Sequence, residues 1–279
     1  MRVLLLVLLL LTGCAAPPAA PPVVPAAPPF ADLEARFGAH LGVYALDTGS
    51  GRDVAYHADQ RFAYASTIKA LATGAVLRKE SDVDKMLTYS PAEVVSHSPV
   101  TGDRTSVTLR EAARAALQQS DNTAGNLLFR ELGGPQGLDA ALHEVGDTTT
   151  HADRTEVTLN EAVPGDVRDT STPRAMATSL RTFLLGDALP ADARALLADW
   201  MRGNTTGATL IRAGLPAQWT VADKSGAGNY GTRNDIAVAW PPSGAPVVLA
   251  VMSTKDAKDA AYDDGLVARA ASVALTALG

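Results

Sequence analysis

Strand-like segments lie near both ends of this chain, and helical segments fill the region between them. Residues 41–46 and 52–56 are rich in apolar and aromatic side chains and are separated by Asp, Thr, Ser and Gly residues typical of a turn. The pattern returns at residues 219–222, 234–240 and 247–253, which are separated by Gly and Pro. Such runs and turns are typical of antiparallel pairing. The sequence therefore predicts one antiparallel sheet built from both ends of the chain.

The middle of the chain is mainly helical in pattern. Apolar residues three and four positions apart indicate the buried faces of the helices, and Gly and Pro residues indicate several of their ends. Helices are predicted from Ser66 onward and over residues 109–118, 123–132, 135–145, 173–184 and 191–201, with terminal helices over 30–39 and 259–278. Residues 147–172 show no clear period, so we expect a long loop there, and loops of that length are often functional.

These patterns predict an α+β fold. We expect an α/β sandwich lobe, in which an antiparallel five-stranded sheet is flanked by terminal helices, plus an inserted all-α lobe. The folded domain should span residues 30–279, with the all-α lobe at about 61–203 and the sheet lobe at about 30–60 and 204–279. A cleft between the two lobes is the expected place for a site.

The first fourteen residues have the layout of an export signal. Arg2 precedes a run of Leu and Val that is too short to span a bilayer. The sequence Leu11-Thr12-Gly13-Cys14 resembles a bacterial lipobox, and a plain cleaved secretory signal is the alternative. Residues 15–29, almost entirely Ala, Pro and Val, predict an extended tether. We therefore expect an exported protein, lipid-anchored through Cys14 on the outer face of the bacterial cell membrane or otherwise secreted.

The charge of the chain argues against polyanionic partners. Its 24 Lys and Arg residues against 30 Asp and Glu residues give a net charge of −6, and the basic residues form no block. We expect no nucleic-acid partner, and membrane contact only through the lipid anchor. Cys14 is the only cysteine and the five histidines never fall at a metal-ligand spacing, so no metal or cofactor is predicted. A monomer acting on a small molecule is the expectation.

A serine and a lysine stand at the start of the first internal helix. Ser66 and Lys69 are three residues apart, so on a helix they share one face. The helix N-terminus would favour a developing oxyanion, and the amine stands beside the hydroxyl, as a serine nucleophile requires. Taken alone, the pair is better explained as a capping serine and a solvated lysine.

Two further motifs fall where the cleft is expected. Ser120 and Asn122 lie in the turn between two predicted helices and offer a hydroxyl and an amide, although this turn is also a good N-cap. Residues 224–228, Lys-Ser-Gly-Ala-Gly, end a predicted strand and offer an ammonium, a hydroxyl and accessible backbone amides. A strand end followed by a glycine-rich turn is the alternative interpretation.

The long loop carries a carboxylate and an amide four residues apart, Glu156 and Asn160. Together such groups can hold and deprotonate one water molecule. Polar residues in surface loops also serve solubility, so this motif is weak by itself.

The four motifs, in this order and separation, resemble those of the class A serine β-lactamases, a family of penicillin-recognising serine hydrolases. The resemblance extends over about residues 30–279 and implies a β-lactamase/transpeptidase-like fold. It implies that Ser66 is acylated by the substrate and that Lys69 is its neighbouring amine. It further implies that Ser120 relays a proton to the leaving nitrogen and that Asn122 holds the substrate amide.

The resemblance also assigns the residues around the substrate carboxylate. Lys224 and Ser225 would bind it, next to Gly226, with Arg233 as a further cation from the adjacent strand. The backbone amides of Ser66 and Ala227 would form the oxyanion hole.

The remaining implied roles lie in the long loop. Glu156 and Asn160 would position the water that removes the acyl group, and Arg154 and Asp169 would be the ion pair that joins the two ends of the loop. His97 stands where the family commonly has an aromatic gate residue, which departs from the pattern. Whether Lys69 or Glu156 is the base for acylation stays open at this stage.

The predicted activity is therefore hydrolysis of the β-lactam amide bond of penicillins, with cephalosporins as a further class, through a covalent acyl-serine and with resulting antibiotic resistance. A penicillin-binding DD-peptidase or transpeptidase resembles this chain in fold and in three motifs, but it lacks the loop pair Glu156 and Asn160. A lipid-anchored binding protein without catalysis is the alternative from another class.

Overall fold

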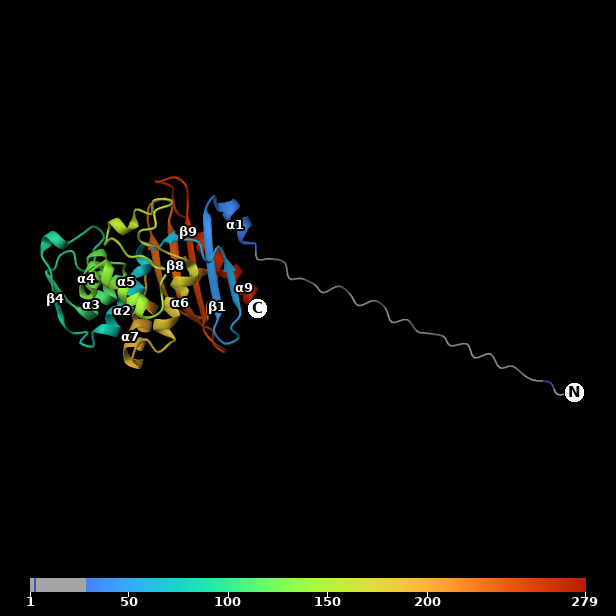
Figure 1. The fold of residues 1–279 in the computed structure, drawn as a ribbon, viewed down its shortest axis with the longest axis horizontal. Helices are drawn as coiled ribbons and strands as arrows, with labels where there is room; N and C mark the ends of the chain where they lie inside the picture. Colours follow the sequence, from blue (N-terminus) through green and yellow to red (C-terminus); the bar gives the residue numbers. More distant parts are fainter. Residues whose placement is uncertain (1–2, 4–28) are drawn as a thin grey trace.

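The structure is a computed structural model that describes Val3 and residues 29–279 (Figure 1). Cys14, most of the predicted signal segment and residues 15–28 of the predicted tether lie outside the described residues, so these assignments stay predictions. Within the part that is described, no helix is both long enough and apolar enough to cross a membrane.

Helices and strands follow one another in an order that begins and ends with the sheet. The helices are α1 (Phe30–Phe37), α2 (Ile68–Lys79), α3 (Leu109–Gln118), α4 (Asn122–Leu132), α5 (Pro135–Glu144), α6 (Pro173–Leu184), α7 (Ala191–Arg202), α8 (Ile211–Gly214) and α9 (Asp264–Leu278), with 3-10 turns η1 (Ala65–Thr67), η2 (Pro91–Glu93) and η3 (Thr158–Asn160). The strands are β1 (His40–Asp47), β2 (Asp53–Tyr56), β3 (Phe62–Ala63), β4 (Met86–Thr88), β5 (Ser106–Thr108), β6 (Thr170–Ser171), β7 (Thr220–Ala227), β8 (Arg233–Trp240) and β9 (Val247–Thr254).

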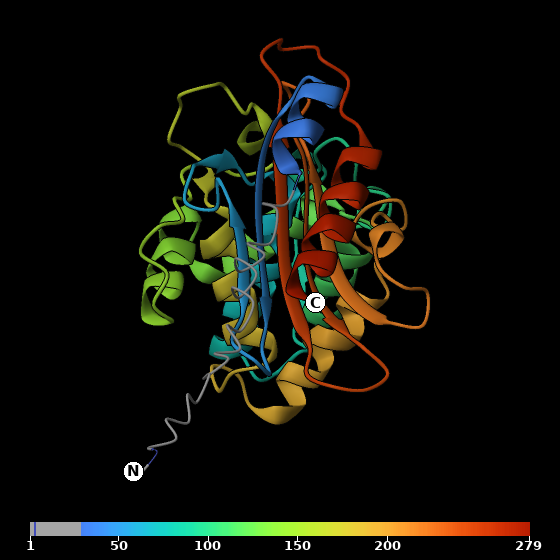
Figure 2. The same ribbon diagram turned by 90° about the vertical axis from the view of Figure 1, so that its right-hand side faces the viewer.

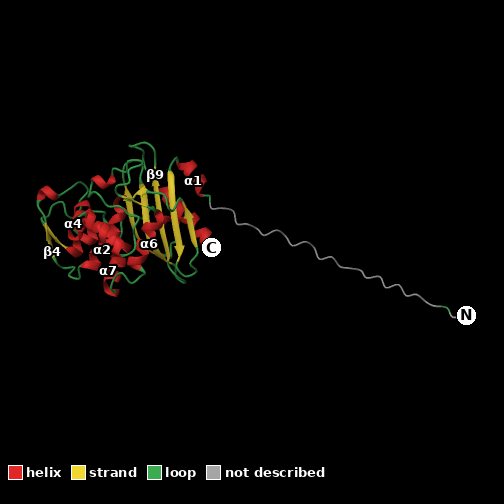
Figure 3. Cartoon of the chain, viewed as in Figure 1, coloured by secondary structure: helices red, strands yellow, loops and turns green. Residues whose placement is uncertain are grey.

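A five-stranded antiparallel sheet is the main β structure, with strand order β2-β1-β9-β8-β7. The two chain ends meet in the β1–β9 pair, where Tyr44 lies opposite Ala250. This confirms the predicted sheet and the α+β fold class. Helices α2 to α5 gather beside the sheet (Figure 1), where Figure 3 shows helices on one side and the strands of the sheet on the other. Their region also contains the short pairs β3–β6 and β4–β5. Strand β7 is an edge strand and lies on the side of these helices.

Both faces of the sheet are buried. In β8, Ile236 and Val238 point into the core shared with the internal helices, whereas Ala237 and Ala239 point into the core shared with the terminal helices. Strands covered on both faces are expected to be continuously apolar rather than alternating, as this strand is. Helix α6 lies against one face, and α1 and α9 cover the other (Figure 2).

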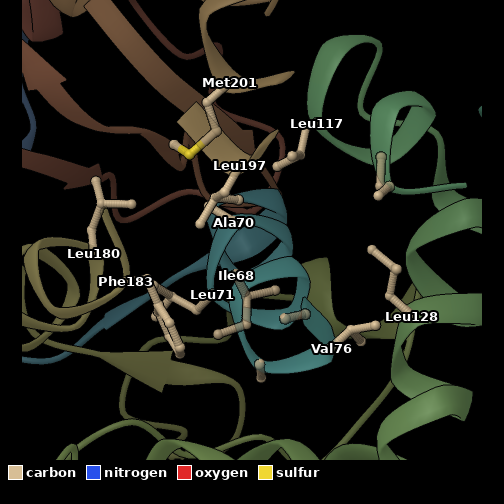
Figure 4. Close-up of a cluster of buried hydrophobic side chains, with 14 of the residues drawn as sticks. Ile68, Ala70, Leu71, Val76, Leu117, Leu128, Leu180, Phe183, Leu197 and Met201 are labelled. Carbon is tan, nitrogen blue, oxygen red and sulfur yellow. The ribbon is translucent and has the colours of Figure 1, made fainter. Parts of the chain in front are cut away.

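Helix α2 is buried on all sides, which makes it a rigid support for the residues at its N-terminus. Every residue from Ile68 to Leu77 is buried, and apolar side chains of four neighbouring helices surround it (Figure 4). A Cβ atom at Gly74 would lie 2.7 Å from the ring of Phe183, so glycine is needed for this close approach. Truncating a buried Leu such as Leu71 to Ala in such a core costs about 2–5 kcal/mol.

Two predicted helix boundaries were wrong. Ser66 does not lie in the α-helix itself but in the 3-10 turn η1, and α2 begins two residues later at Ile68. The final helix begins at Asp264 rather than at residue 259, because the carboxylate of Asp263 accepts a hydrogen bond from the backbone of Gly265 and caps the helix. Residues 259–263 therefore belong to a loop.

Candidate active site

The oxygen of Ser66 lies between an amine and a carboxylate. Its Oγ accepts a hydrogen bond from Lys69 Nζ at 3.1 Å and donates one to Glu156 Oε1 at 3.2 Å. Lys69 Nζ and Glu156 Oε1 are themselves 2.9 Å apart, and both side chains are fully buried. The turn η1 holds Ser66 immediately before α2, whose first turn carries Lys69 three residues later on the same side. A serine hydroxyl with two potential bases in contact is arranged for nucleophilic attack.

Lys69 is held by polar groups from the helical region. Besides its contacts with Ser66 and Glu156, its ammonium donates to the Ser120 carbonyl at 2.8 Å and to Asn122 Oδ1 at 2.7 Å. Burial lowers the pKa of Lys69, and the Glu156 carboxylate partly opposes this shift. A Cβ at Gly125 would lie 2.8 Å from Lys69 Cε, so the absence of a side chain there leaves room for the lysine.

The turn between α3 and α4 both caps a helix and supplies polar groups to the site, the two roles considered from the sequence. Asp121 caps α4 by accepting from the backbone of Ala124 at 2.8 Å, and it also accepts a hydrogen bond from Thr101 Oγ1 at 2.7 Å. Asp121 is fixed by these contacts, and its neighbours Ser120 and Asn122 line the cavity described below. Ser120 adopts a left-handed backbone conformation, with φ of 56°, which turns the chain sharply at this point.

Strand β7 brings a second lysine into the same site. Lys224 Nζ donates to Ser120 Oγ at 3.1 Å and to the Ser225 carbonyl at 2.7 Å. Burial, reinforced by the positive charge of Lys69, lowers the pKa of Lys224 to about 7. The hydroxyl of Ser225 lies 2.6 Å from Thr206 Oγ1. The site therefore contains two buried amines, and this combination favours binding of an anionic group.

Glycine allows β7 to approach the serine turn. A Cβ atom at Gly226 would lie 2.9 Å from the Tyr64 carbonyl oxygen and 3.1 Å from the Thr67 backbone nitrogen. Because β7 is an edge strand, the N–H groups on its outer side are not paired with another strand. The motif forms the end of β7, as expected: the strand ends at Ala227 and Gly228 follows it.

The long loop is anchored at both of its ends. Arg154 Nε and Asp169 Oδ2 form an ion pair of 2.5 Å, and Asp169 also accepts from the backbone nitrogens of Asp153 and Arg154 and from Tyr64 Oη. The Asp169 side chain is fully buried, so this network compensates the burial of its charge. Nearer the serine, Asn126 exchanges two hydrogen bonds with the backbone of Glu156, at 2.8 and 3.0 Å.

Asn160 lies beside Glu156 and has one polar atom to spare. Its Nδ2 donates to Glu156 Oε2 at 2.5 Å. Its Oδ1 is buried without a hydrogen-bond partner among the residues that the structure describes. Since buried polar atoms are nearly always bonded, this oxygen is suited to accept a hydrogen bond from a small polar molecule.

These groups border one cavity of about 380 Å³, a size suited to a small molecule. It is lined by Ser66, His97, Ser120, Asn122, Asn160, Thr206, Ser225, Gly226, Ala227, Arg233 and Tyr262. All four motifs found in the sequence contribute to the cavity or to the charges behind it. Arg154 and Asp169 lie outside it, in the support of the loop. Between residues 29 and 279, no cluster of His, Cys, Asp or Glu side chains has a metal-binding arrangement.

Three residues of the site were missed in the sequence. Asn126 could have been found because it lies four residues after Asn122, on the same face of α4. Thr206 and Tyr262 lie in loops without a distinctive pattern, so no signal in the sequence pointed to them.

Comparison with known proteins identifies the family. The model described as "Beta-lactamase enzyme family" matches residues 26–278 of the chain. This chain is a member of the β-lactamase enzyme family. A β-lactamase of Amycolatopsis lactamdurans is 59% identical over 254 residues, covering 90% of this chain and 84% of that protein. A β-lactamase of Bacillus licheniformis is 50% identical over 287 residues, covering 99% of this chain and 94% of that protein.

Solved structures agree with this family assignment. The crystal structure of a class A β-lactamase from Clostridium kluyveri is similar with a TM-score of 0.87 at 48% identity, covering 89% of this chain and 97% of the other. A halotolerant bacterial β-lactamase has a TM-score of 0.87 at 50% identity, with 89% and 98% coverage. The resemblance noted from the four motifs is therefore confirmed across the folded chain.

Proposed function

We propose that this protein hydrolyses the β-lactam amide bond of penicillins, and of cephalosporins as a further class, through an acyl-enzyme on Ser66. The observation that carries the proposal is the position of Ser66 Oγ, in hydrogen-bond contact with both Lys69 and Glu156. Removal of the drug by this reaction would confer antibiotic resistance. The activity needs no metal or cofactor in this proposal.

Acylation would begin when Ser66 Oγ attacks the lactam carbonyl. The Oγ–carbon bond forms, the carbon–nitrogen bond breaks, and the serine proton passes either to Lys69 as a neutral amine or, through a water molecule, to the carboxylate of Glu156. Ser120, whose Oγ lies 3.1 Å from Lys224 and 3.5 Å from Lys69, would deliver a proton to the leaving nitrogen. The backbone N–H groups of Ser66 and Ala227 would stabilise the oxyanion.

The substrate would be oriented through its own polar groups. We assign the carboxylate to Ser225 and Arg233, which line the cavity, with Lys224 buried directly behind them as a second basic group. Gly226 keeps the substrate close to the backbone of β7. Asn122 would hold the amide of the acylamino side chain.

Deacylation would use Glu156 and Asn160. The carboxylate of Glu156 lies near Ser66 Oγ, and the free Oδ1 of Asn160 lies beside it. A water molecule held between them would lose its proton to Glu156 and attack the acyl carbon, which frees Ser66. Arg154 and Asp169 would act structurally by keeping this loop in place. This step separates a hydrolase from a DD-peptidase that stays acylated.

We also propose, from residues 1–29, that the protein is exported. We further propose that it acts as a monomer. Lipid attachment at Cys14 would hold it on the outer face of the cell membrane, with secretion as the alternative. The mass of the mature protein tests this, because an anchored form carries acyl chains on its N-terminal cysteine.

The proposed activity is tested by adding a chromogenic β-lactam to the purified protein and recording intact mass during the reaction. Sustained turnover, lost in Ser66→Ala, is the expected result. Stoichiometric acylation without turnover would point instead to a penicillin-binding DD-peptidase. Binding without acylation or turnover would point to a non-catalytic binding protein.

A further inference from the structure

Tyr262 lines the cavity but has no part in the chemistry proposed above. It lies in the loop of residues 259–263 that precedes α9, and it is 50% exposed. Large aromatic side chains are usually buried, so a half-exposed ring that borders a substrate cavity is a candidate contact surface for a ligand.

The ring of Tyr262 is held against a cation of the site. The guanidinium carbon of Arg233 lies 4.7 Å from the ring centroid, within the range of a cation–π contact. Arg233 is in turn fixed, because its Nε donates to Asp264 Oδ1 at 2.7 Å and its side chain is only 11% exposed. One face of the ring is therefore occupied by a guanidinium that cannot move freely.

Asp264 is itself well placed to hold Arg233. Its other oxygen accepts a hydrogen bond from Thr209 Oγ1 at 2.5 Å, and it is the first residue of α9, where the helix dipole favours a negative charge. Partial burial raises the pKa of Asp264, but the hydrogen bonds from Arg233 and Thr209 outweigh it and leave the pKa below its ordinary value. The chain Thr209–Asp264–Arg233–Tyr262 is thus a connected support for the aromatic ring.

The place of this ring relative to the substrate follows from the proposed function, on which the inference rests. If Arg233 and Ser225 bind the carboxylate, the acylamino side chain extends toward Asn122. In a cephalosporin, the C3 carbon of the six-membered ring is next to the carbon that carries the carboxylate. Its substituent therefore lies beside the carboxylate, near Arg233 and the neighbouring Tyr262.

We propose that Tyr262 is a specificity-determining residue that contacts this substituent of the fused ring and favours planar, conjugated groups over small ones. A flat group can lie against the ring in an offset stack, whereas a methyl group makes only a small contact. The hydroxyl of Tyr262 is not needed for this contact, so Phe should replace Tyr with little effect.

The test uses two cephalosporins with the same phenylacetylamino side chain, one with a methyl and one with a styryl group at C3. Their kcat/KM values are compared in the wild-type protein, in Tyr262→Phe and in Tyr262→Leu. We expect Tyr262→Leu to lower kcat/KM about fivefold to tenfold for the styryl compound and less than twofold for the methyl compound, in line with the usual strength of an aromatic stack. Tyr262→Phe should keep the wild-type ratio.

Controls separate this effect from the general activity. Met86→Ala, at an exposed position on β4 far from the cavity, should leave both values unchanged. If Tyr262→Leu leaves the ratio of the two kcat/KM values unchanged, whether or not both values fall, the specificity role would be overturned. If Tyr262→Leu does not fold, Tyr262→Trp should raise the styryl preference at least twofold, and an unchanged ratio there would overturn the role. Hydrolysis of benzylpenicillin but of neither cephalosporin by the wild-type protein would also overturn the specificity role. Hydrolysis of none of these three compounds would instead refute the proposed function itself.

Discussion

Replacing Glu156 by Gln should convert the protein from a hydrolase into one that is trapped by its substrate. The amide has nearly the same shape as the carboxylate and can still accept a hydrogen bond from Lys69, but it cannot take a proton from water. General-base catalysis contributes about 10²–10⁴-fold, so we expect kcat to fall about 1,000-fold.

Acylation should survive this change better than deacylation. Burial already lowers the pKa of Lys69, and the Glu156 carboxylate opposes that shift. Without the carboxylate, the pKa of Lys69 falls further, which favours the neutral amine that can act as a base 3.1 Å from Ser66 Oγ. The acyl-enzyme should therefore form and accumulate.

The fold should tolerate the same change. Removing one partner of a buried ion pair costs about 3–5 kcal/mol when the other charge is left without compensation. In Glu156→Gln, Lys69 still has acceptors in Ser66, Ser120 and Asn122. We therefore expect a smaller loss, visible as a modest decrease in Tm.

The assay combines steady-state kinetics with intact mass spectrometry after mixing with benzylpenicillin. The expected spectrum shows Glu156→Gln with the mass of one whole antibiotic molecule added, while the wild-type protein shows almost no such adduct. Full turnover by the variant with no adduct would refute the role of Glu156 in deacylation. Absence of both turnover and adduct, in a folded variant, would show that Glu156 is required for acylation as well.

Three further predictions test the anchoring of the long loop, the second lysine and the close approach of Gly228 to Asn160. Arg154→Ala removes the ion-pair partner of the buried Asp169, which keeps its hydrogen bonds from Tyr64 Oη and from two backbone nitrogens. The unfolding free energy should therefore fall by less than about 3–5 kcal/mol, the cost of an uncompensated buried charge, and thermal or denaturant unfolding measures this. Lys224 has a pKa of about 7 when folded and about 10.4 when unfolded. Between these pH values the unfolded chain therefore binds more protons than the folded protein. The unfolding free energy of the wild-type protein, relative to that of Lys224→Met, should rise with pH across this window by up to about 1.4 kcal/mol per pH unit. A difference that does not change with pH would contradict the lowered pKa of Lys224. Gly228→Val should lower kcat about tenfold or more by accumulating acyl-enzyme, since a Cβ there would lie 2.9 Å from the Asn160 carbonyl oxygen; unchanged kcat would contradict this reasoning.

Most of the fold could be predicted from the sequence because local signals were strong. The apolar runs of β8 and β9 and the Gly and Pro residues between them indicated strands. The α+β class followed because the strand-like segments lie near the two ends of the chain and the helical segments lie between them. Boundaries were less predictable where capping decided them. Alanine and aspartate after residue 259 continue a helical pattern, but Asp263 caps the helix and starts it at Asp264.

The candidate site was predictable in its residue types but not in its contacts. Four short motifs named a serine, two lysines and a carboxylate, while each motif alone had an ordinary structural explanation. Only the fold brings Lys224 within 3.1 Å of Ser120 and Glu156 within 3.2 Å of Ser66. Asn126, which holds the backbone of Glu156, was missed because its partner lies thirty residues away in a loop without regular structure.

The sequence by itself determined which chemical groups this protein possesses and the order in which helices and strands present them, because propensity, capping and turn formation act over a few neighbouring residues. Only the tertiary structure decided the charge state and partners of those groups. Burial lowers the pKa values of Lys69 and Lys224, and packing of a loop against α9 sets Tyr262 beside Arg233. Desolvation and contacts between distant segments exist only once the chain has folded, so no local pattern can reveal them.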